Sequence, residues 1–131
     1  MINTVVEKDN VMRLMDMSIE EVKPGYAKVS MPLAKKVQNG MGLAHGGSIF
    51  SLADIAFGVA ANEGSPYFVV TLNTSIEYLR PGSTGPLVAE ARCIRSGKKI
   101  QHYEVNIYDG TGTLIARTMT SGFTTTSRQG E

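Results

Sequence analysis

Apolar residues fill almost every position from 49 to 61, where only Ser51, Asp54 and Gly58 interrupt them. Because the interruptions are three and four residues apart, they form one narrow stripe along a helix. A helix that is apolar nearly all round is typical of a buried helix. The pattern therefore predicts one long buried helix that opens at residues 45–48.

Alternating apolar and polar positions mark most of the remaining chain as strands. In residues 69–80 the even positions Val70, Leu72, Ile76 and Tyr78 are apolar and the odd positions Thr71, Asn73, Ser75 and Glu77 are polar, which predicts a half-buried strand. Further strands are expected over residues 17–23, 26–31, 87–95, 103–107 and 114–125. Their connections are too short for parallel crossovers, so we expect a mainly antiparallel sheet.

This order of elements predicts a single α+β domain over residues 1–131, with one long central helix wrapped by a curved antiparallel sheet of five to six strands. Residues 1–16 form a predicted N-terminal helical segment, because Val11, Met12, Leu14 and Met15 suit a short amphipathic helix. Residues 125–131 lack apolar core residues and are expected to form a flexible tail.

Composition and charge narrow the functional classes. A chain of 131 residues can bury a core without disulfides or metal. Its formal net charge of +1 gives no global attraction to nucleic acid or membrane, so neither partner is expected. The single cysteine, Cys93, cannot form an intrachain disulfide or a zinc set, which favours a reducing, cytoplasmic location. The N-terminus does not resemble a signal peptide.

Asp54 is the only charged residue between His45 and Glu63, within the helix expected to be buried. Burying an unpaired carboxylate is costly or raises its pKa. Two interpretations follow. Asp54 is either a structural carboxylate satisfied by a neighbouring hydroxyl or backbone group, or a catalytic base or nucleophile, since perturbed carboxylates gather at active sites.

Gly46 and Gly47 begin the predicted helix, where unpaired N–H groups and the helix dipole can hold an oxyanion. An ordinary glycine entry to a helix is the simpler interpretation. His45 suits either a general acid or, more simply, a hydrogen-bonding structural residue. No serine or cysteine nucleophile motif follows either histidine, which argues against a Ser-His-Asp triad.

Basic residues cluster at two predicted turns. Arg95, Lys98 and Lys99 surround Gly97, and Arg80 ends the strand before. Most such clusters are solvated turns, but a compact basic patch can also hold the phosphates of a nucleotide-like ligand.

Two blocks of sequence together resemble a known family. Residues 39–54 read NGMGLAHGGSIFSLAD and residues 73–82 read NTSIEYLRPG. Both blocks are similar to those of hotdog-fold thioesterases of the phenylacetic-acid-degradation type, and the likeness extends from about Asn39 to Phe123. The resemblance implies a hotdog fold and hydrolysis of a small or aromatic acyl-CoA, such as phenylacetyl-CoA, to free acid and coenzyme A. It implies no metal and no cofactor besides the coenzyme A thioester substrate.

The resemblance also implies roles for individual residues. Asp54 would be the catalytic carboxylate, the Gly46 amide would polarise the thioester carbonyl, Asn39 would place substrate or water, and His45 would lie near the thioester. The residues expected to contact the substrate are Gly47, Ser51, Asn73, Ser75, Arg80, Arg95, Lys98 and Lys99.

Helix geometry adds a requirement. Gly46 and Asp54 are eight residues apart, which is roughly 12 Å along a helix axis. One chain cannot bring both to the same carbonyl, so two subunits must share the site. We therefore expect a homo-oligomer, at least a dimer, and a tetramer built as a dimer of dimers.

Two other functions use the same fold. One is a non-catalytic acyl-CoA binding or sensing module, but a pure binder has no use for a carboxylate such as Asp54 beside the thioester. The other is a hydratase-type enzyme, which would need a second proton-transfer residue aimed at the acyl chain. No basic DNA-binding segment is present, which weakens a regulatory role.

Overall fold

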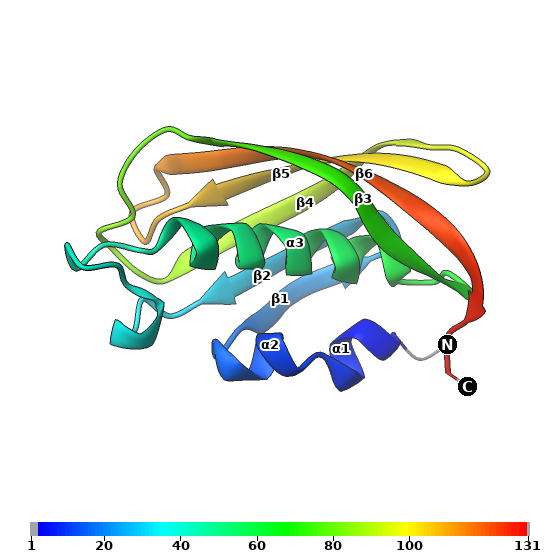
Figure 1. Ribbon diagram of the computed structural model, residues 1–131, viewed down its shortest axis with the longest axis horizontal. Helices are drawn as coiled ribbons and strands as arrows, with labels where there is room; N and C mark the ends of the chain where they lie inside the picture. Colours follow the sequence, from blue (N-terminus) through cyan, green and yellow to red (C-terminus); the bar gives the residue numbers. More distant parts are fainter. Residues whose placement is uncertain (1–2, 131) are drawn as a thin grey trace.

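The computed structural model describes residues 3–130 as one curved sheet packed against a long helix (Figure 1). The helices are α1 (Thr4–Lys8), α2 (Asn10–Leu14), the 3-10 helix η1 (Lys35–Val37) and α3 (Gly46–Asn62). The strands are β1 (Ser18–Lys23), β2 (Tyr26–Met31), β3 (Tyr67–Tyr78), β4 (Leu87–Ser96), β5 (Ile100–Tyr108) and β6 (Leu114–Arg128). The predicted α+β architecture is confirmed. None of the helices in this described part has the length and hydropathy needed to cross a membrane.

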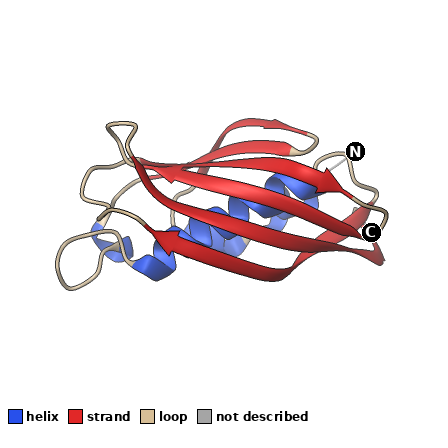
Figure 2. Ribbon diagram, turned by 90° about the horizontal axis from the view of Figure 1, so that it is seen from above, coloured by secondary structure: helices blue, strands red, loops and turns tan. Residues whose placement is uncertain are grey.

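The sheet is antiparallel throughout, in the order β1-β2-β4-β5-β6-β3. Figure 2 shows it curving over α3, so that its concave face meets the apolar side of the helix. Leu52 and Val105 are fully buried in this interface, and the rings of Phe57 and Tyr103 meet edge to face with centroids 5.2 Å apart. Each such buried side chain contributes about 1.5–3 kcal/mol to the free energy of folding, so the apolar sides of α3 hold it against the sheet.

The polar stripe of α3 lies beside the core. Ser51, Asp54 and Gly58 are the predicted stripe, and all three are only partly buried. The stripe faces β3 and α1, because Asp54 hydrogen-bonds Thr71 of β3 and Gly58 lies next to Val5 of α1. The expectation that Asp54 is deeply buried is therefore wrong for a single chain.

The strand predicted over residues 69–80 forms as β3, but the prediction that all its even-numbered apolar side chains face the core is wrong. Val70 and Leu72 are 45% and 56% exposed. A register shift between Thr71 and Asn73 moves the alternation by one residue, so Thr71 faces the helix before the bulge and Ile76 after it. β3 is also an edge strand, and this leaves its exposed apolar side chains uncovered in one chain.

The N-terminal helical segment is present but divided in two. Asp9 has an extended backbone that ends α1, and its side chain caps α2 by accepting a hydrogen bond from the Met12 N–H at 2.9 Å. Residues 1–2 of the predicted segment lie outside the described residues.

The flexible tail predicted over residues 125–131 is wrong for residues 125–130. β6 continues to Arg128, and the Gln129 amide donates to the backbone oxygens of Asn62 and Ser65, each at 2.9 Å. Gln129 also accepts from the Thr4 N–H at 3.1 Å, which places the two ends of the described part of the chain side by side (Figure 1). Hydrogen bonds rather than apolar burial hold this segment, so hydropathy could not predict it. Residue 131 lies outside the described residues.

Candidate active site

The first turn of α3 has a well-defined hydrogen-bond pattern. His45 is the N-cap residue, and its Nδ1 accepts from the Gly47 N–H at 3.0 Å, so the proton of the neutral ring lies on Nε2. The Ser51 hydroxyl donates to the Gly47 oxygen at 2.9 Å. The Gly46 N–H, at the first helical position, has no backbone or side-chain acceptor within residues 3–130. This N–H can therefore donate to a substrate.

Tyr78 fixes the same turn from β3. Its hydroxyl donates to the Gly46 oxygen at 2.7 Å, so the peptide between Gly46 and Gly47 is held at its oxygen by Tyr78 and at its N–H by His45. Burial of the hydroxyl raises the pKa of Tyr78, although 51% of the residue is exposed, so it remains a donor at neutral pH. A Cβ at Gly46 would lie 3.2 Å from the Tyr78 oxygen, which explains the glycine. The alternation in the sequence marks Tyr78 only as an apolar strand position and gives no sign of this contact.

A groove joins three of the predicted residues. Its volume is about 410 Å³, and Asn39, Gly46 and Arg80 lie along it. The Asn39 side-chain oxygen accepts from the N–H groups of Met41 and Leu43 at 2.9 and 3.1 Å, which shapes the loop before α3. Since this oxygen is occupied by the loop, the Asn39 amide nitrogen is the end that can reach a ligand.

Asp54 opens into a different hollow. Its Oδ1 accepts from the Thr71 hydroxyl at 2.8 Å, and it lines a volume of about 330 Å³ between α1, α3 and β3. A neighbouring hydroxyl thus satisfies one carboxylate oxygen, while Oδ2 has no hydrogen-bond partner in the described part of the chain. Thr71 was missed in the sequence because the bulge in β3, which turns it toward α3, leaves no mark in the alternation.

Other predicted residues lie apart from these two hollows. Asn73 and Ser75 are exposed and pair with Ser121 and Met119, which places their side chains on the outer face of the sheet. The basic residues of the β4–β5 hairpin are exposed and lie at the C-terminal end of α3; they are Arg95, Lys98 and Lys99. One chain therefore divides the predicted site among separate regions.

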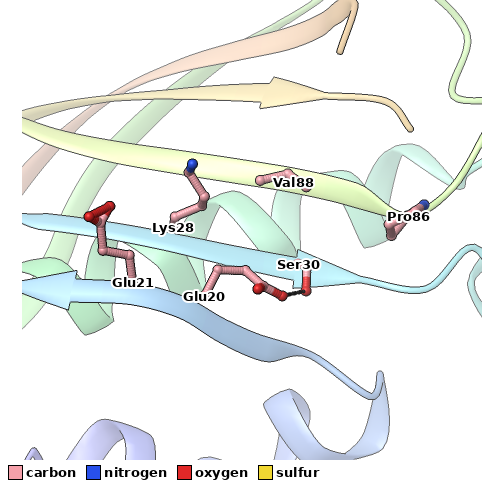
Figure 3. A pocket seen from close by; sticks show the side chains of 6 residues that line it. All are labelled: Glu20, Glu21, Lys28, Ser30, Pro86 and Val88. Carbon is pink, nitrogen blue, oxygen red and sulfur yellow. Dashed lines mark hydrogen bonds between the residues drawn. The ribbon is translucent and has the colours of Figure 1, made fainter. Parts of the chain in front are cut away.

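The outer face of the sheet also has a hollow, shown in Figure 3, of about 610 Å³. It is lined by Glu20, Glu21, Lys28, Ser30, Pro86 and Val88. The Ser30 hydroxyl donates to Glu20 at 2.6 Å, and the mixed charges leave no cluster suited to catalysis. Residues 3–130 contain no group of three or more His, Cys, Asp or Glu placed to hold a metal ion. The candidate site is therefore on the α3 side of the sheet.

Known proteins are similar to this chain in sequence and in architecture. The sequence matches the thioesterase superfamily over residues 41–116, more than half of the chain. A protein of Archaeoglobus fulgidus that carries an esterase name is 38% identical over 111 residues, covering 84% of this chain and 71% of its own. The acyl-coenzyme A thioesterase PaaI of Escherichia coli is 34% identical over 106 residues, covering 80% of this chain and 75% of its own.

The solved structure of the Escherichia coli PaaI protein, from the phenylacetic acid degradation operon, superposes with a TM-score of 0.89. The two chains are 28% identical in this comparison, which covers 95% of this chain and 91% of that one. Both the sequence match and the superposition agree with the resemblance found in the sequence. The chain belongs to the thioesterase superfamily, has the hotdog fold and is a thioester hydrolase.

Proposed function

We propose that this enzyme hydrolyses a small or aromatic acyl-CoA, such as phenylacetyl-CoA, to the free acid and coenzyme A. The observation that carries the proposal is the Asp54 carboxylate, held at one oxygen by Thr71 and free at the other, on a helix whose Gly46 N–H is available. The acyl-coenzyme A thioesterase named among its relatives supports coenzyme A as the thiol. The reaction needs no cofactor besides its substrate, and the lone Cys93 fits a cytoplasmic enzyme.

The reaction uses a donor and a carboxylate on opposite sides of one carbonyl. The thioester oxygen accepts a hydrogen bond from Gly46 of one subunit, which stabilises the negative charge that develops on it. Asp54 of the other subunit either attacks the carbonyl carbon or takes a proton from the water that attacks. The C–S bond then breaks, and coenzyme A leaves as a thiolate that takes up a proton. When water attacks, the other product is the free acid; when Asp54 attacks, a mixed anhydride remains, and a water must hydrolyse it to release the acid and restore the carboxylate. Asn39 and His45 present further N–H donors beside the carbonyl.

A dimer is required because Gly46 and Asp54 are roughly 12 Å apart along one helix. Two α3 helices that run antiparallel across a two-fold axis bring Gly46 of each beside Asp54 of the other. The free edge of β3 supports this arrangement, since an exposed edge with apolar side chains such as Val70 and Leu72 favours pairing with a second copy. Met119 and Ile94, which are 44% and 54% exposed, leave further apolar surface for a dimer of dimers.

The nucleotide of coenzyme A is expected beyond the N-terminus of α3. In the antiparallel pair, the β4–β5 hairpin of the partner subunit lies on the same side as Arg80 of the first. Arg80 and the hairpin cations would then face one solvent-exposed anionic group from two subunits. This explains why the predicted basic residues are far apart in one chain.

Reversing the charges of Lys98 and Lys99 to Glu is expected to raise KM for acyl-CoA by roughly tenfold with little change in kcat, because each exposed charge contact contributes about 0.2–1 kcal/mol to ground and transition states alike. Steady-state kinetics with thiol release as the readout measure both constants. A truncated thioester without the nucleotide is the control and should be hydrolysed equally by parent and variant. An equal loss with both substrates, or none with either, would remove the two lysines from the site.

A panel of acyl-CoAs tests the function itself. Short, long and aromatic acyl-CoAs are incubated with the enzyme, and release of the coenzyme A thiol is followed. We expect turnover of the small and aromatic members. A well-folded enzyme that releases no thiol from any of them would contradict the proposal.

A further inference from the structure

We propose that the hollow beside Asp54 holds the acyl group, that Gly58 and Val5 set the length of acyl chain it admits, and that Asp9 restricts it to uncharged acyl groups. This inference rests on the proposed function and names the substrate class of the same site. The hollow lies between α1, α3 and β3, and Asp54 forms one of its walls.

Position and chemistry connect the hollow to the reaction. If Asp54 acts at the thioester carbonyl, the acyl chain bonded to that carbon must begin next to its carboxylate. The hollow of about 330 Å³ begins there and is of the size that small-molecule ligands occupy. Val5, Phe57 and Val69 provide apolar surface along it, which suits a hydrocarbon or aromatic group.

Gly58 is the clearest sign that the space is kept open. A glycine inside a helix costs about 1 kcal/mol relative to alanine. A Cβ at Gly58 would meet only Val5, at 3.7 Å, which is an ordinary contact, whereas a Cβ at Gly122 would lie 2.6 Å from the Phe57 ring. Packing within the chain therefore requires glycine at 122 but not at 58. At position 58, one turn after Asp54, the missing side chain leaves the hollow open.

Charge limits what can enter. Asp9 and Asp54 are the two charged residues among those that line the hollow, and none of the lining residues is cationic. Their hydrogen-bond donors, the Met12 N–H for Asp9 and the Thr71 hydroxyl for Asp54, are uncharged. The negative charges of the two carboxylates therefore act on any anion that enters. An acyl chain that ends in a carboxylate would meet like charge without compensation. An uncharged acyl group meets only the apolar walls.

The length limit is tested by the kcat/KM of saturated acyl-CoAs of increasing length. Gly58→Leu should lower kcat/KM about 10- to 100-fold for the longest chain that the parent accepts and leave acetyl-CoA within about threefold, since one methylene in an apolar pocket changes discrimination by roughly 10–200-fold. Val5→Ala should raise kcat/KM about tenfold for chains one or two carbons longer. Val6→Ala is the matched control, because Val6 is on the same helix and also partly buried but does not line the hollow.

The charge limit is tested with succinyl-CoA against butyryl-CoA, which differ in a terminal carboxylate. Asp9→Asn should raise the succinyl-to-butyryl ratio of kcat/KM about tenfold, and it keeps the cap of α2 because Asn caps as well as Asp. Glu7→Gln is the control, since Glu7 is an exposed acid of α1 outside the hollow and its loss should leave the ratio unchanged.

The outcomes separate this inference from the function on which it rests. A parent enzyme that hydrolyses no acyl-CoA would end the proposed function, and the acyl pocket with it. In another outcome the parent is active, but its chain-length profile is unchanged by Gly58→Leu and Val5→Ala, or is changed equally by Val6→Ala. Either result would place the acyl group elsewhere, and the proposed acyl-CoA hydrolysis would still stand. If Gly58→Leu fails to fold or assemble, the Val5 and Val6 pair decides alone. An unchanged ratio in Asp9→Asn would overturn the charge limit.

Discussion

Replacing Asp54 by Asn is expected to lower kcat for acyl-CoA hydrolysis by roughly 10²-fold or more, while the substrate still binds. A nucleophilic or general-base carboxylate contributes at least this much, and an amide can do neither task at neutral pH. Asn keeps the shape of Asp and can still accept the Thr71 hydroxyl at its oxygen, so the variant should fold with a thermal midpoint near that of the parent. Steady-state kinetics and equilibrium binding of a non-hydrolysable acyl-CoA analogue measure the two effects.

Thr71→Ser is the matched control for this experiment. It changes the neighbour of Asp54 but retains the hydroxyl that donates to Oδ1, so most of the activity should remain. If Asp54→Asn hydrolyses thioesters at the parent rate, the carboxylate is the structural one that the sequence also allowed. If binding is lost together with kcat, Asp54 contributes to substrate affinity rather than to the chemical step.

The parts of this molecule that were predictable from sequence are those fixed by local periodicity. The run from residue 49 to 61 has one polar stripe, and a helix is the only regular structure that aligns Ser51, Asp54 and Gly58. The roles expected of Asn39, His45 and Gly46 came from the family resemblance, and the helix start explains only why His45 and Gly46 lie together. The strand alternation likewise predicted an antiparallel sheet of five to six strands, and six form, with bounds near the expected ones.

The contacts made by β3 were not predictable because they depend on register. The bulge between Thr71 and Asn73 turns Thr71 toward Asp54 and leaves Asn73 on the outer face, whereas unbroken alternation places the two on the same face. The hydrogen bond from Tyr78 to Gly46 depends on the same shift. A residue that reaches the site across 17 or 32 positions leaves no spacing signal in the chain.

Mixing two inactive variants is expected to restore about a quarter of the parent activity, if the site is shared between subunits. The variants are Asp54→Ala and Gly46→Pro, and each removes one half of the site. Proline removes the backbone N–H, and the backbone accepts it, because Gly46 is the first helical residue and His45 before it is already extended, with φ −66° and ψ 136°. Its Cβ requires a small shift of the Tyr78 side chain, whose hydroxyl oxygen would lie 3.2 Å away. In a mixed dimer one site receives both defects and the other receives neither. Random pairing makes half of the dimers mixed, each with one working site of two.

The matched control mixes the parent with a chain that carries both changes. When sites are shared, each site of a mixed dimer contains one defect, so only parent homodimers work and about a quarter of the activity remains. When each chain holds its own complete site, about half remains, and the first mixture restores nothing. Co-refolding in equal amounts, with circular dichroism to check folding and mass spectrometry to count mixed dimers, measures both arms. Mixed dimers without restored activity would contradict the shared site and require new roles for Gly46 and Asp54.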